Sequence, residues 1–179
     1  MAPIHGPFRD FWHTTTGKQQ RMNWSAHVTV ATLVAREGRF LLVEETGLEG
    51  EVVFNQPAGH VEAHETLATA AVRETLEETG WDVELTGFLG VYTYTPPRHP
   101  DITYFRMAYL ARPLQHHPER ALDEGIIAAR WLTLDELRAT GQARSPLVLR
   151  CIEDALAGRC FPLDVVYDPA FVPVTGQGE

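Results

Sequence analysis

The sequence is poor in cysteine and has no long apolar run. Its 179 residues include two cysteines, Cys151 and Cys160, which form no metal-binding motif. A reduced, cytoplasmic protein accounts for this composition better than a disulfide framework does. No apolar run approaches the length of a membrane span, and residues 1–12 lack the apolar segment of a secretory signal. We therefore expect no membrane partner and no export signal.

Basic residues are also scarce. The chain has 15 Lys and Arg residues against 24 Asp and Glu residues, which gives a formal net charge of -9. Binding to the backbone of a nucleic acid polymer depends on a basic surface that releases counterions, so this balance argues against such a partner. An acidic protein can still bind the phosphates of a small molecule where divalent metal ions supply the positive charge.

One stretch, residues 59–81, carries an unusual pattern. We predict that a helix spans residues 66–79, and that the glycine after it ends the helix in a left-handed conformation. On this helix, spacing of i, i+3 and i+4 puts three glutamates on one side. Seven residues of the stretch stand at fixed spacing: Gly59, Glu65, Arg73, Glu74, Glu77, Glu78 and Gly80.

Three carboxylates on one side of a helix repel one another. On an ordinary acidic helix, solvent screens that repulsion. The alternative is a cation between the carboxylates, and clustered oxygen ligands suit Mg²⁺ or Mn²⁺, which also bind substrate phosphates. The complete pattern favours the cation over the solvated helix, because so many fixed positions rarely coincide by chance.

The stretch resembles the Nudix box, G-x5-E-x7-R-E-U-x-E-E-x-G-U with U apolar, at all seven positions where the box specifies one residue. It departs from the box at Thr75, where an aliphatic residue is usual, and Trp81 is bulkier than the usual aliphatic residue. Residues 54–60, FNQPAGH, and 144–148, RSPLV, are similar to a narrower branch of the Nudix family, the NudJ-type phosphatases. Together the resemblance covers about residues 24–166.

The resemblance implies an α/β fold (α+β, with a mixed sheet), the Nudix α/β/α sandwich, which carries the acidic Nudix-box helix and the C-terminal helices. We expect one domain at 24–166, after an N-terminal extension at 1–23 and before a C-terminal tail at 167–179. Met22 leaves a second start position open. The residue patterns predict strands at 26–35, 39–45, 52–55, 82–94, 102–111 and 126–132, a loop at 113–124, and helices at 133–140 and 145–157.

The resemblance also implies roles for the box residues. Nudix enzymes hydrolyse a diphosphate linked to another group, by attack of water on phosphorus. Glu74, Glu77 and Glu78 are expected to bind Mg²⁺ or Mn²⁺, with the Gly59 carbonyl as a neutral fourth oxygen. Arg73 is expected to orient neighbouring carboxylates through bidentate hydrogen bonds.

The base that activates the attacking water is less well defined. In the family it is a box glutamate or an acidic residue of a later loop. Glu65 is expected to aim the metal ligands. In the later loop we prefer Glu124 to Asp123 and Asp101, although a solvated loop acid explains it equally well. Glu44–Glu45 are expected to be surface acids. The catalytic candidates are therefore Glu65, Glu77, Glu78 and Glu124.

Substrate contacts are harder to derive. A base or sugar would stack on an aromatic side chain such as Tyr94, although core packing explains such residues as well. Arg98 with His99, or Arg144, could hold a terminal phosphate. Gln56 lies in the stretch that is similar to the NudJ-type branch. The substrate-binding candidates are therefore Arg98, Tyr94 and Gln56.

The expected activity is hydrolysis of nucleoside tri- and diphosphates with release of orthophosphate, and of the hydroxymethylpyrimidine diphosphate precursor of thiamine. Two alternatives stay open. One is a Nudix hydrolase of another diphosphate, such as a nucleotide sugar or an isoprenoid diphosphate. The other is a non-catalytic Nudix module that senses a nucleotide, although such modules usually lose acidic residues of the box. The protein is expected to be a monomer or a homodimer.

Overall fold

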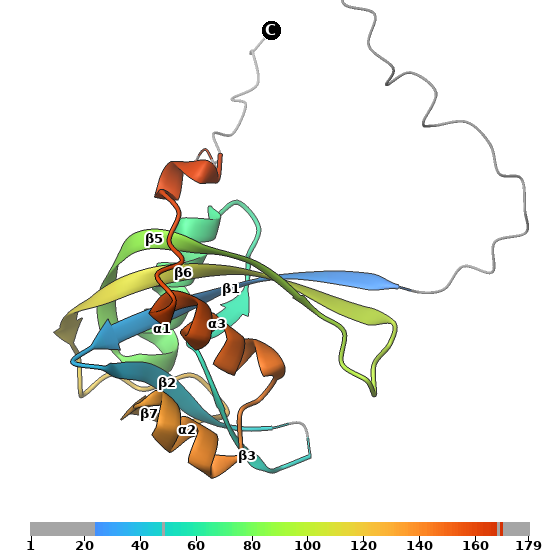
Figure 1. The fold of residues 1–179 in the computed structure, drawn as a ribbon, viewed down its shortest axis with the longest axis horizontal. Coiled ribbons are helices and arrows are strands. Elements are labelled where there is room, and N and C mark those ends of the chain that lie inside the picture. Colours follow the sequence, from blue (N-terminus) through green and yellow to red (C-terminus); the bar gives the residue numbers. More distant parts are fainter. Residues whose placement is uncertain (1–23, 48, 168, 170–179) are drawn as a thin grey trace, which may run out of the picture.

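The computed structural model describes residues 24–47, 49–167 and 169, which fold around one sheet (Figure 1). The expected extension at 1–23 lies outside these residues, as does nearly all of the expected tail at 167–179. The strands are β1 (Ser25–Arg36), β2 (Arg39–Thr46), β3 (Val52–Asn55), β4 (Ala58–His60), β5 (Trp81–Tyr94), β6 (Ile102–His116) and β7 (Ile126–Leu132). The helices are α1 (Leu67–Thr79), α2 (Leu134–Thr140) and α3 (Pro146–Leu156), followed by a 3₁₀ turn at Leu163–Val165.

The sheet is mixed, as expected. Its strands follow the order β3-β2-β1-β6-β5, with β4 paired to β1 and β7 paired to β2. β1 and β6 run parallel, and the other pairs are antiparallel. β1 pairs with β2 only at Ala35 and Arg36, beside the hairpin turn, whereas β4 pairs with Thr29–Ala31 farther along β1. β1 and β2 therefore diverge away from their hairpin turn, and β4 pairs with β1 where β2 no longer does.

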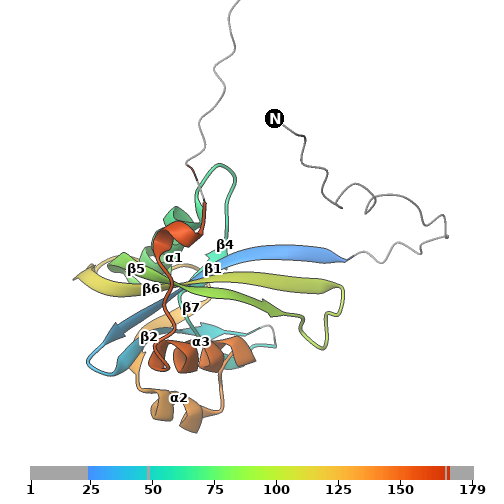
Figure 2. The ribbon, with the colours of Figure 1, turned by 45° about the horizontal axis from the view of Figure 1, so that its top comes forward.

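Helices cover both faces of the sheet, which is the α/β/α arrangement that the Nudix resemblance implies (Figure 2). α1 packs its small residues Ala70 and Ala71 against Val30 of β1. α2 and α3 pack with Leu33 of the same strand on the opposite face. Successive side chains of a strand point to opposite faces, so β1 contributes to both layers of the core.

The ends of α1 follow from its sequence. Thr66 caps the first turn, where its Oγ1 accepts a backbone hydrogen bond at 3.1 Å, and Gly80 ends the helix with a left-handed φ of 69°. Thr75, where the Nudix box usually has an aliphatic residue, donates to the carbonyl of Ala71 at 2.7 Å. Its Oγ1 lies 2.6 Å from the Oγ1 of Thr32 on β1, so the unusual hydroxyl is satisfied within the core.

Two elements differ from the sequence prediction. The short strand β4 was not among the predicted strands, because three residues are too few to show a period. β6 continues to His116, although a loop was expected from 113 onward. Pro113 is tolerated there because the pairing of β6 with β1 ends at Ala111, so the missing N–H has no second strand to bond in the described part of the chain.

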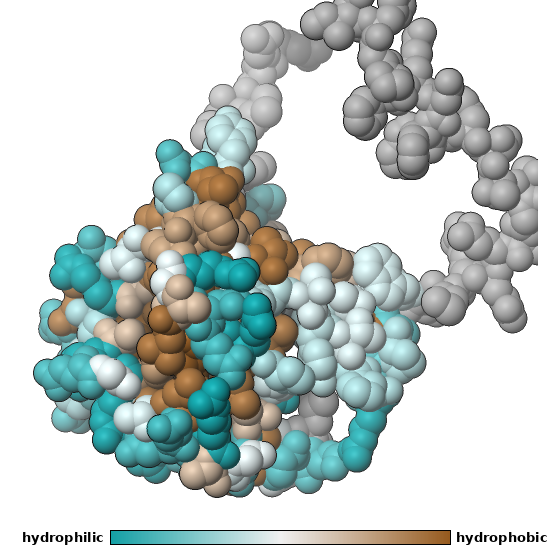
Figure 3. Space-filling view, in the orientation of Figure 1, coloured by the Kyte–Doolittle hydropathy of each residue, from teal (hydrophilic) through white to brown (hydrophobic). Residues whose placement is uncertain are grey.

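Apolar residues are exposed after α3. Leu156 ends the helix, and Phe161, Leu163 and Val165 follow it with exposed side chains. Figure 3 shows apolar residues gathered along this part of the surface.

Within the described residues, no helix combines the length and the apolar character that crossing a bilayer requires.

Candidate active site

The acidic side of α1 faces the backbone of β4. A side chain added at Gly59 would overlap the carboxylate of Glu74, so only glycine permits this close approach. The backbone N–H of Ala58 donates to Glu78 Oε2 at 2.8 Å. β4, which the sequence did not predict, therefore lies directly against the glutamates that the box spacing puts on one side of the helix.

Arg73 holds three carboxylates at once. Its Nε and Nη2 donate to the two oxygens of Glu65 at 3.1 and 2.7 Å. Its Nη1 donates to Glu74 Oε1 at 2.8 Å and to Glu77 Oε2 at 2.9 Å, and its Nη2 also donates to the carbonyl of His60 at 3.1 Å. The bond with Glu65 is the main reason that the pKa of Arg73 is raised and the pKa of Glu65 is lowered. Arg73 thus fixes the side chains around it.

The carboxylates of Glu74 and Glu78 are buried close to other negative charges. Burial, with smaller effects from the charges of Glu45, Glu74 and Asp123, raises the pKa of Glu78 to about 8, although the Ala58 N–H acts in the opposite direction. Burial also raises the pKa of Glu74, against the lowering effect of Arg73. A carboxylate that is removed from water beside like charges favours a compensating cation.

We call the carboxylates of Glu45, Glu74, Glu77 and Glu78 the acidic cluster. Each gives one oxygen to a hydrogen bond or ion pair within the protein. The second oxygen of each accepts no hydrogen bond from a described residue, and that of Glu45 is buried. Among the described residues, no three acidic, histidine or cysteine side chains already converge as a metal centre. The free oxygens are nevertheless the hard ligands that Mg²⁺ and Mn²⁺ bind, so these residues fit a divalent metal ion.

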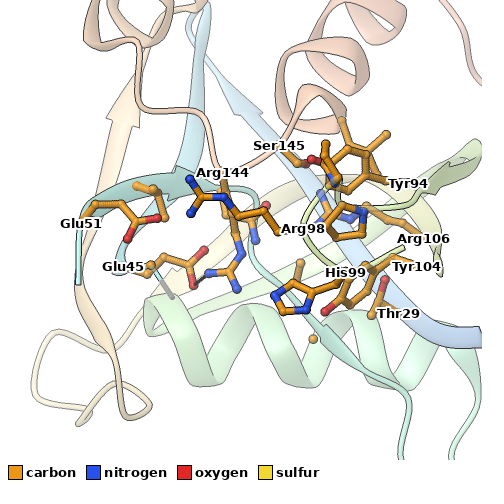
Figure 4. A pocket seen from close by; sticks show the side chains of 18 of the residues that line it. Thr29, Glu45, Glu51, Tyr94, Arg98, His99, Tyr104, Arg106, Arg144 and Ser145 are labelled. Atoms are coloured by element: carbon orange, nitrogen blue, oxygen red, sulfur yellow. Dashed lines mark ion pairs between the residues drawn. The ribbon is translucent and has the colours of Figure 1, made fainter. Parts of the chain in front are cut away.

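A pocket of about 820 Å³ opens beside the acidic cluster (Figure 4). Gly59 and Glu45 both line it. Three arginines from different segments line the same pocket: Arg98 after β5, Arg106 on β6 and Arg144 before α3. Arg144 pairs with Glu45 at 2.8 Å, whereas no ion pair of Arg106 with a described residue is found. Arg98 pairs with Glu49 of the same pocket, so Arg106 is the one of the three arginines without an ion pair to a described residue.

The predicted substrate contacts fall at different depths. Arg98, which is exposed, and Tyr94 both line the pocket. Gln56 is 1% exposed and lies beneath it. Its Nε2 donates to the carbonyl of Val148 on α3 at 2.8 Å, and its Oε1 accepts from Arg106 Nη1 at 3.2 Å. Contact between Gln56 and substrate stays a prediction, and the bonds that it makes support Arg106.

Two neighbouring loop acids lie differently. Asp123 is tied to α1, because its backbone N–H donates to the carbonyl of Glu77 at 3.2 Å, and its charge acts on Glu74 and Glu78. Both side chains are exposed, and the role of Glu124 as a general base stays a prediction. The structure therefore brings the less favoured of the two loop candidates to the acidic side of the helix.

Two site residues were missed from the sequence. The expectation that Glu45 is a surface acid is wrong: its side chain is 14% exposed and lines the pocket. Alternation along β2 puts Glu45 on the same face as the fully buried Val43, which is a signal that the sequence contained. Arg106 is the one charged residue in the strand predicted at 102–111, and that isolation was the corresponding signal.

Comparison with known proteins adds an independent observation. The family model of the NUDIX domain matches residues 25–150. Phosphatase NudJ of Escherichia coli (strain K12) is 38% identical to this chain over 142 residues, which cover 79% of the chain and 91% of that protein.

Solved structures agree with the fold. A NUDIX hydrolase from Nitrosomonas europaea superposes with a TM-score of 0.76 at 39% sequence identity, over 79% of this chain and 96% of that one. A MutT NUDIX hydrolase from Burkholderia pseudomallei superposes with a TM-score of 0.62 at 24% identity, over 73% of this chain and 98% of that one. The second likeness concerns the fold alone.

Proposed function

Since the chain belongs to the Nudix hydrolase family and hydrolyses phosphoanhydride bonds in small-molecule substrates, we propose that it acts on nucleoside tri- and diphosphates. It releases orthophosphate from them, and it also hydrolyses the hydroxymethylpyrimidine diphosphate precursor of thiamine. The likeness to phosphatase NudJ over most of both chains supports this substrate class. We place the reaction in the cytoplasm, in keeping with the low cysteine content.

The observation that carries the proposal is the position of the acidic cluster beside a pocket lined by three arginines. A divalent metal ion held by carboxylates binds one part of a polyphosphate, and guanidinium groups bind another part. A volume of about 820 Å³ is in the range of sites that enclose small molecules. The pocket therefore suits a substrate with a polyphosphate and a further group.

In this proposal Glu74, Glu77 and Glu78, with the carbonyl of Gly59, hold Mg²⁺ or Mn²⁺. The bound metal ion supplies positive charge to the substrate phosphates and lowers the pKa of water. The chain's own contribution is orientation: Arg73 holds Glu74 and Glu77, and the N–H of Ala58 holds Glu78. Glu65 acts through Arg73, whose guanidinium it anchors with both oxygens.

Attack of water on phosphorus also needs a proton acceptor. Glu124 is our first candidate, and Asp123 is the second because of its contact with α1. The variants Glu124→Gln and Asp123→Asn separate them. The base is the residue whose amide variant lowers kcat while KM stays unchanged. If neither variant lowers kcat, the base is one of the box glutamates.

Phosphate release tests the proposal as a whole. The purified protein is given nucleoside di- and triphosphates, nucleotide sugars, an isoprenoid diphosphate and the thiamine precursor, with and without Mg²⁺, and orthophosphate is separated from pyrophosphate. We expect metal-dependent orthophosphate release from several nucleotides. Glu78→Gln should remove most turnover and keep the fold, whereas Glu84→Gln, an exposed control on β5, should match the wild type. Release from nucleotide sugars alone would contradict the proposed substrate class.

A further inference from the structure

Arg106 is a buried cation that forms no ion pair with any residue that the structure describes. Its side chain comes from β6 and lines the pocket, and the residue is 9% exposed. Within the described residues, its only hydrogen bond runs from Nη1 to Gln56 Oε1 at 3.2 Å, and its Nε is buried without a partner. Burial of an unpaired guanidinium is costly, so proteins usually pair it or use it to bind an anion.

Other polar atoms near Arg106 are unpartnered too. The buried side-chain atoms without a partner among the described residues are Thr29 Oγ1, Glu45 Oε1, Asn55 Oδ1 and Arg106 Nε. All four residues line the same pocket. Thr29 stands directly beside Arg106 in the parallel pairing of β1 and β6, so both side chains leave the sheet on one face. Buried polar groups are rarely left unpaired, and their concentration in one pocket points to a ligand.

The charges around Arg106 favour a negatively charged ligand. Burial lowers the pKa of Arg106 and the positive charge of Arg144 lowers it further, against raising effects of Cys151, Glu45 and Glu78 that are each smaller than the effect of burial. Arg144 is partly neutralised by Glu45, which leaves Arg106 as the less compensated of the two. An anion between the guanidinium groups of Arg106 and Arg144 would offset the cost of burying the unpaired charge and would reduce the repulsion between the two. The edge formed by Nε and Nη2 is free among the described contacts, and this is an edge that binds two phosphate oxygens.

Arg106 is also close enough to the acidic cluster to share a substrate with it. His60 of β4, Thr29 of β1 and Arg106 of β6 stand side by side across the sheet. With strands about 4.8 Å apart, the Cα atoms of His60 and Arg106 are about 10 Å apart. Thr29, Tyr104 and Arg106 gather on one side of the pocket, opposite Glu45 and Glu51 (Figure 4). One polyphosphate can therefore extend from Gly59 to Arg106.

We propose that Arg106, together with the Thr29 hydroxyl and Arg144, forms a subsite for the free terminal phosphate of the substrate. This inference rests on the proposed function. A terminal phosphate has three acceptor oxygens and a charge of about −1.5 to −2, whereas a phosphate capped by a sugar has one fewer oxygen and a smaller charge. A bidentate guanidinium edge, a hydroxyl and a second guanidinium match the terminal group. The subsite thus distinguishes nucleoside di- and triphosphates from capped diphosphates.

A binding experiment tests the subsite without turnover. The thermal unfolding midpoint is measured with and without inorganic phosphate in the presence of a chelator, which removes divalent metal ions from the acidic cluster. Phosphate should raise the midpoint of the wild type and of Arg112→Met, a control on the same strand whose exposed side chain pairs with Glu84. It should not raise the midpoint of Arg106→Met. Equal stabilisation of all three proteins would overturn the proposal.

A kinetic experiment tests the specificity. For a nucleoside diphosphate, Arg106→Met should lower kcat/KM by about 10- to 100-fold, the usual worth of a hydrogen bond to a charged group, mainly through KM. For a nucleotide sugar, the same variant should match the wild type, and Arg112→Met should match it on both substrates. An equal loss on both substrates would overturn the proposal.

A second variant and a second readout separate failure of the subsite from failure of folding or of the proposed function. Arg106→Lys keeps the buried charge but not the two-pronged edge, so it should fold even if Arg106→Met does not, and it should lose kcat/KM on the nucleoside diphosphate alone. If the wild type releases no phosphate from nucleoside di- or triphosphates, the proposed function fails. The subsite then stands if stabilisation by phosphate depends on Arg106, and it fails if that dependence is absent.

Discussion

Arg73 and Arg106 lie at the two ends of one site in opposite surroundings. Arg73 donates hydrogen bonds to Glu65, Glu74 and Glu77, and its pKa is raised. Arg106 is more deeply buried, has a single bond to an amide oxygen, and its pKa is lowered. The guanidinium of Arg73 donates its hydrogen bonds to protein carboxylates, whereas the guanidinium of Arg106 keeps N–H groups that a ligand can bind. The difference separates a residue that builds the site from one that recognises a ligand.

Removal of Arg73 should have the largest effect. Arg73→Met leaves three carboxylates without their shared donor, so we expect the free energy of unfolding to fall by about 2–3 kcal/mol. Because the expected metal ligands lose their orientation, kcat should fall by about 10- to 100-fold. Urea denaturation and steady-state kinetics measure the two effects. Full activity in this variant would break the comparison, because Arg73 would then not build the site.

Addition of a methyl group at Gly59 should have the second-largest effect. Gly59→Ala forces the carboxylate of Glu74 to turn aside and lose its hydrogen bond from Arg73, and we expect a loss of about 1.5 kcal/mol in unfolding free energy. Stabilisation by Mg²⁺, measured as the shift in thermal midpoint, should disappear. Gly38→Ala is the control: its φ is 76° but it has open space around it, so it should cost about 1 kcal/mol and keep the response to Mg²⁺.

Thr75 offers a smaller test, at a buried hydroxyl whose hydrogen-bond partners all come from the protein. Thr75→Val removes the hydroxyl that lies 2.6 Å from Thr32 Oγ1, and the buried Thr32 hydroxyl loses its partner. We expect a cost of about 1 kcal/mol in chemical denaturation. The double variant Thr32→Val/Thr75→Val should recover most of this cost, because no buried hydroxyl then remains unpaired. A double variant less stable than either single variant would contradict this interpretation.

The smallest effect should have the opposite sign. Arg106→Met replaces an uncompensated buried cation by an apolar chain, and this gain outweighs the loss of the donor to the buried Gln56 Oε1, so we expect the free energy of unfolding to rise by about 0.5 kcal/mol in the absence of phosphate. Arg112→Met, on the surface of the same strand, should change it by less than about 0.5 kcal/mol. A destabilised Arg106→Met would mean that Arg106 supports the fold as Arg73 does, and the contrast between them would disappear.

The elements that the sequence predicted are those with local signals. α1 has a threonine cap, a small apolar face and a terminal glycine, and its predicted range was correct to within one residue. The β1–β2 hairpin turns at Glu37 and Gly38, which both have positive φ, between the strands predicted at 26–35 and 39–45. β4 was missed because its pairing with β1 is a long-range property that three residues do not encode. The extension of β6 was missed because Pro113 normally ends a strand.

The same distinction applies to the site. Glu65, Arg73 and the three helix glutamates lie within one stretch, so fixed spacing was enough to bring them together. Glu45 and Arg106 come from β2 and β6, and the meeting of those strands at one pocket depends on the sheet order. Whether an arginine has a counterion is likewise a property of the folded chain. The sequence predicted the helix glutamates and the loop arginines Arg98 and Arg144, but it could not predict that Glu45 and Arg106 join them.

Gln56 gives this arrangement a further consequence. One end of its amide holds Arg106, and the other end is bonded to the main chain of α3 at Val148. The register of α3 on the sheet therefore controls where the guanidinium points, although α3 is remote from the acidic motif in the sequence. A shift of this one outer helix would therefore move the Arg106 guanidinium while the glutamates of α1 stay in place.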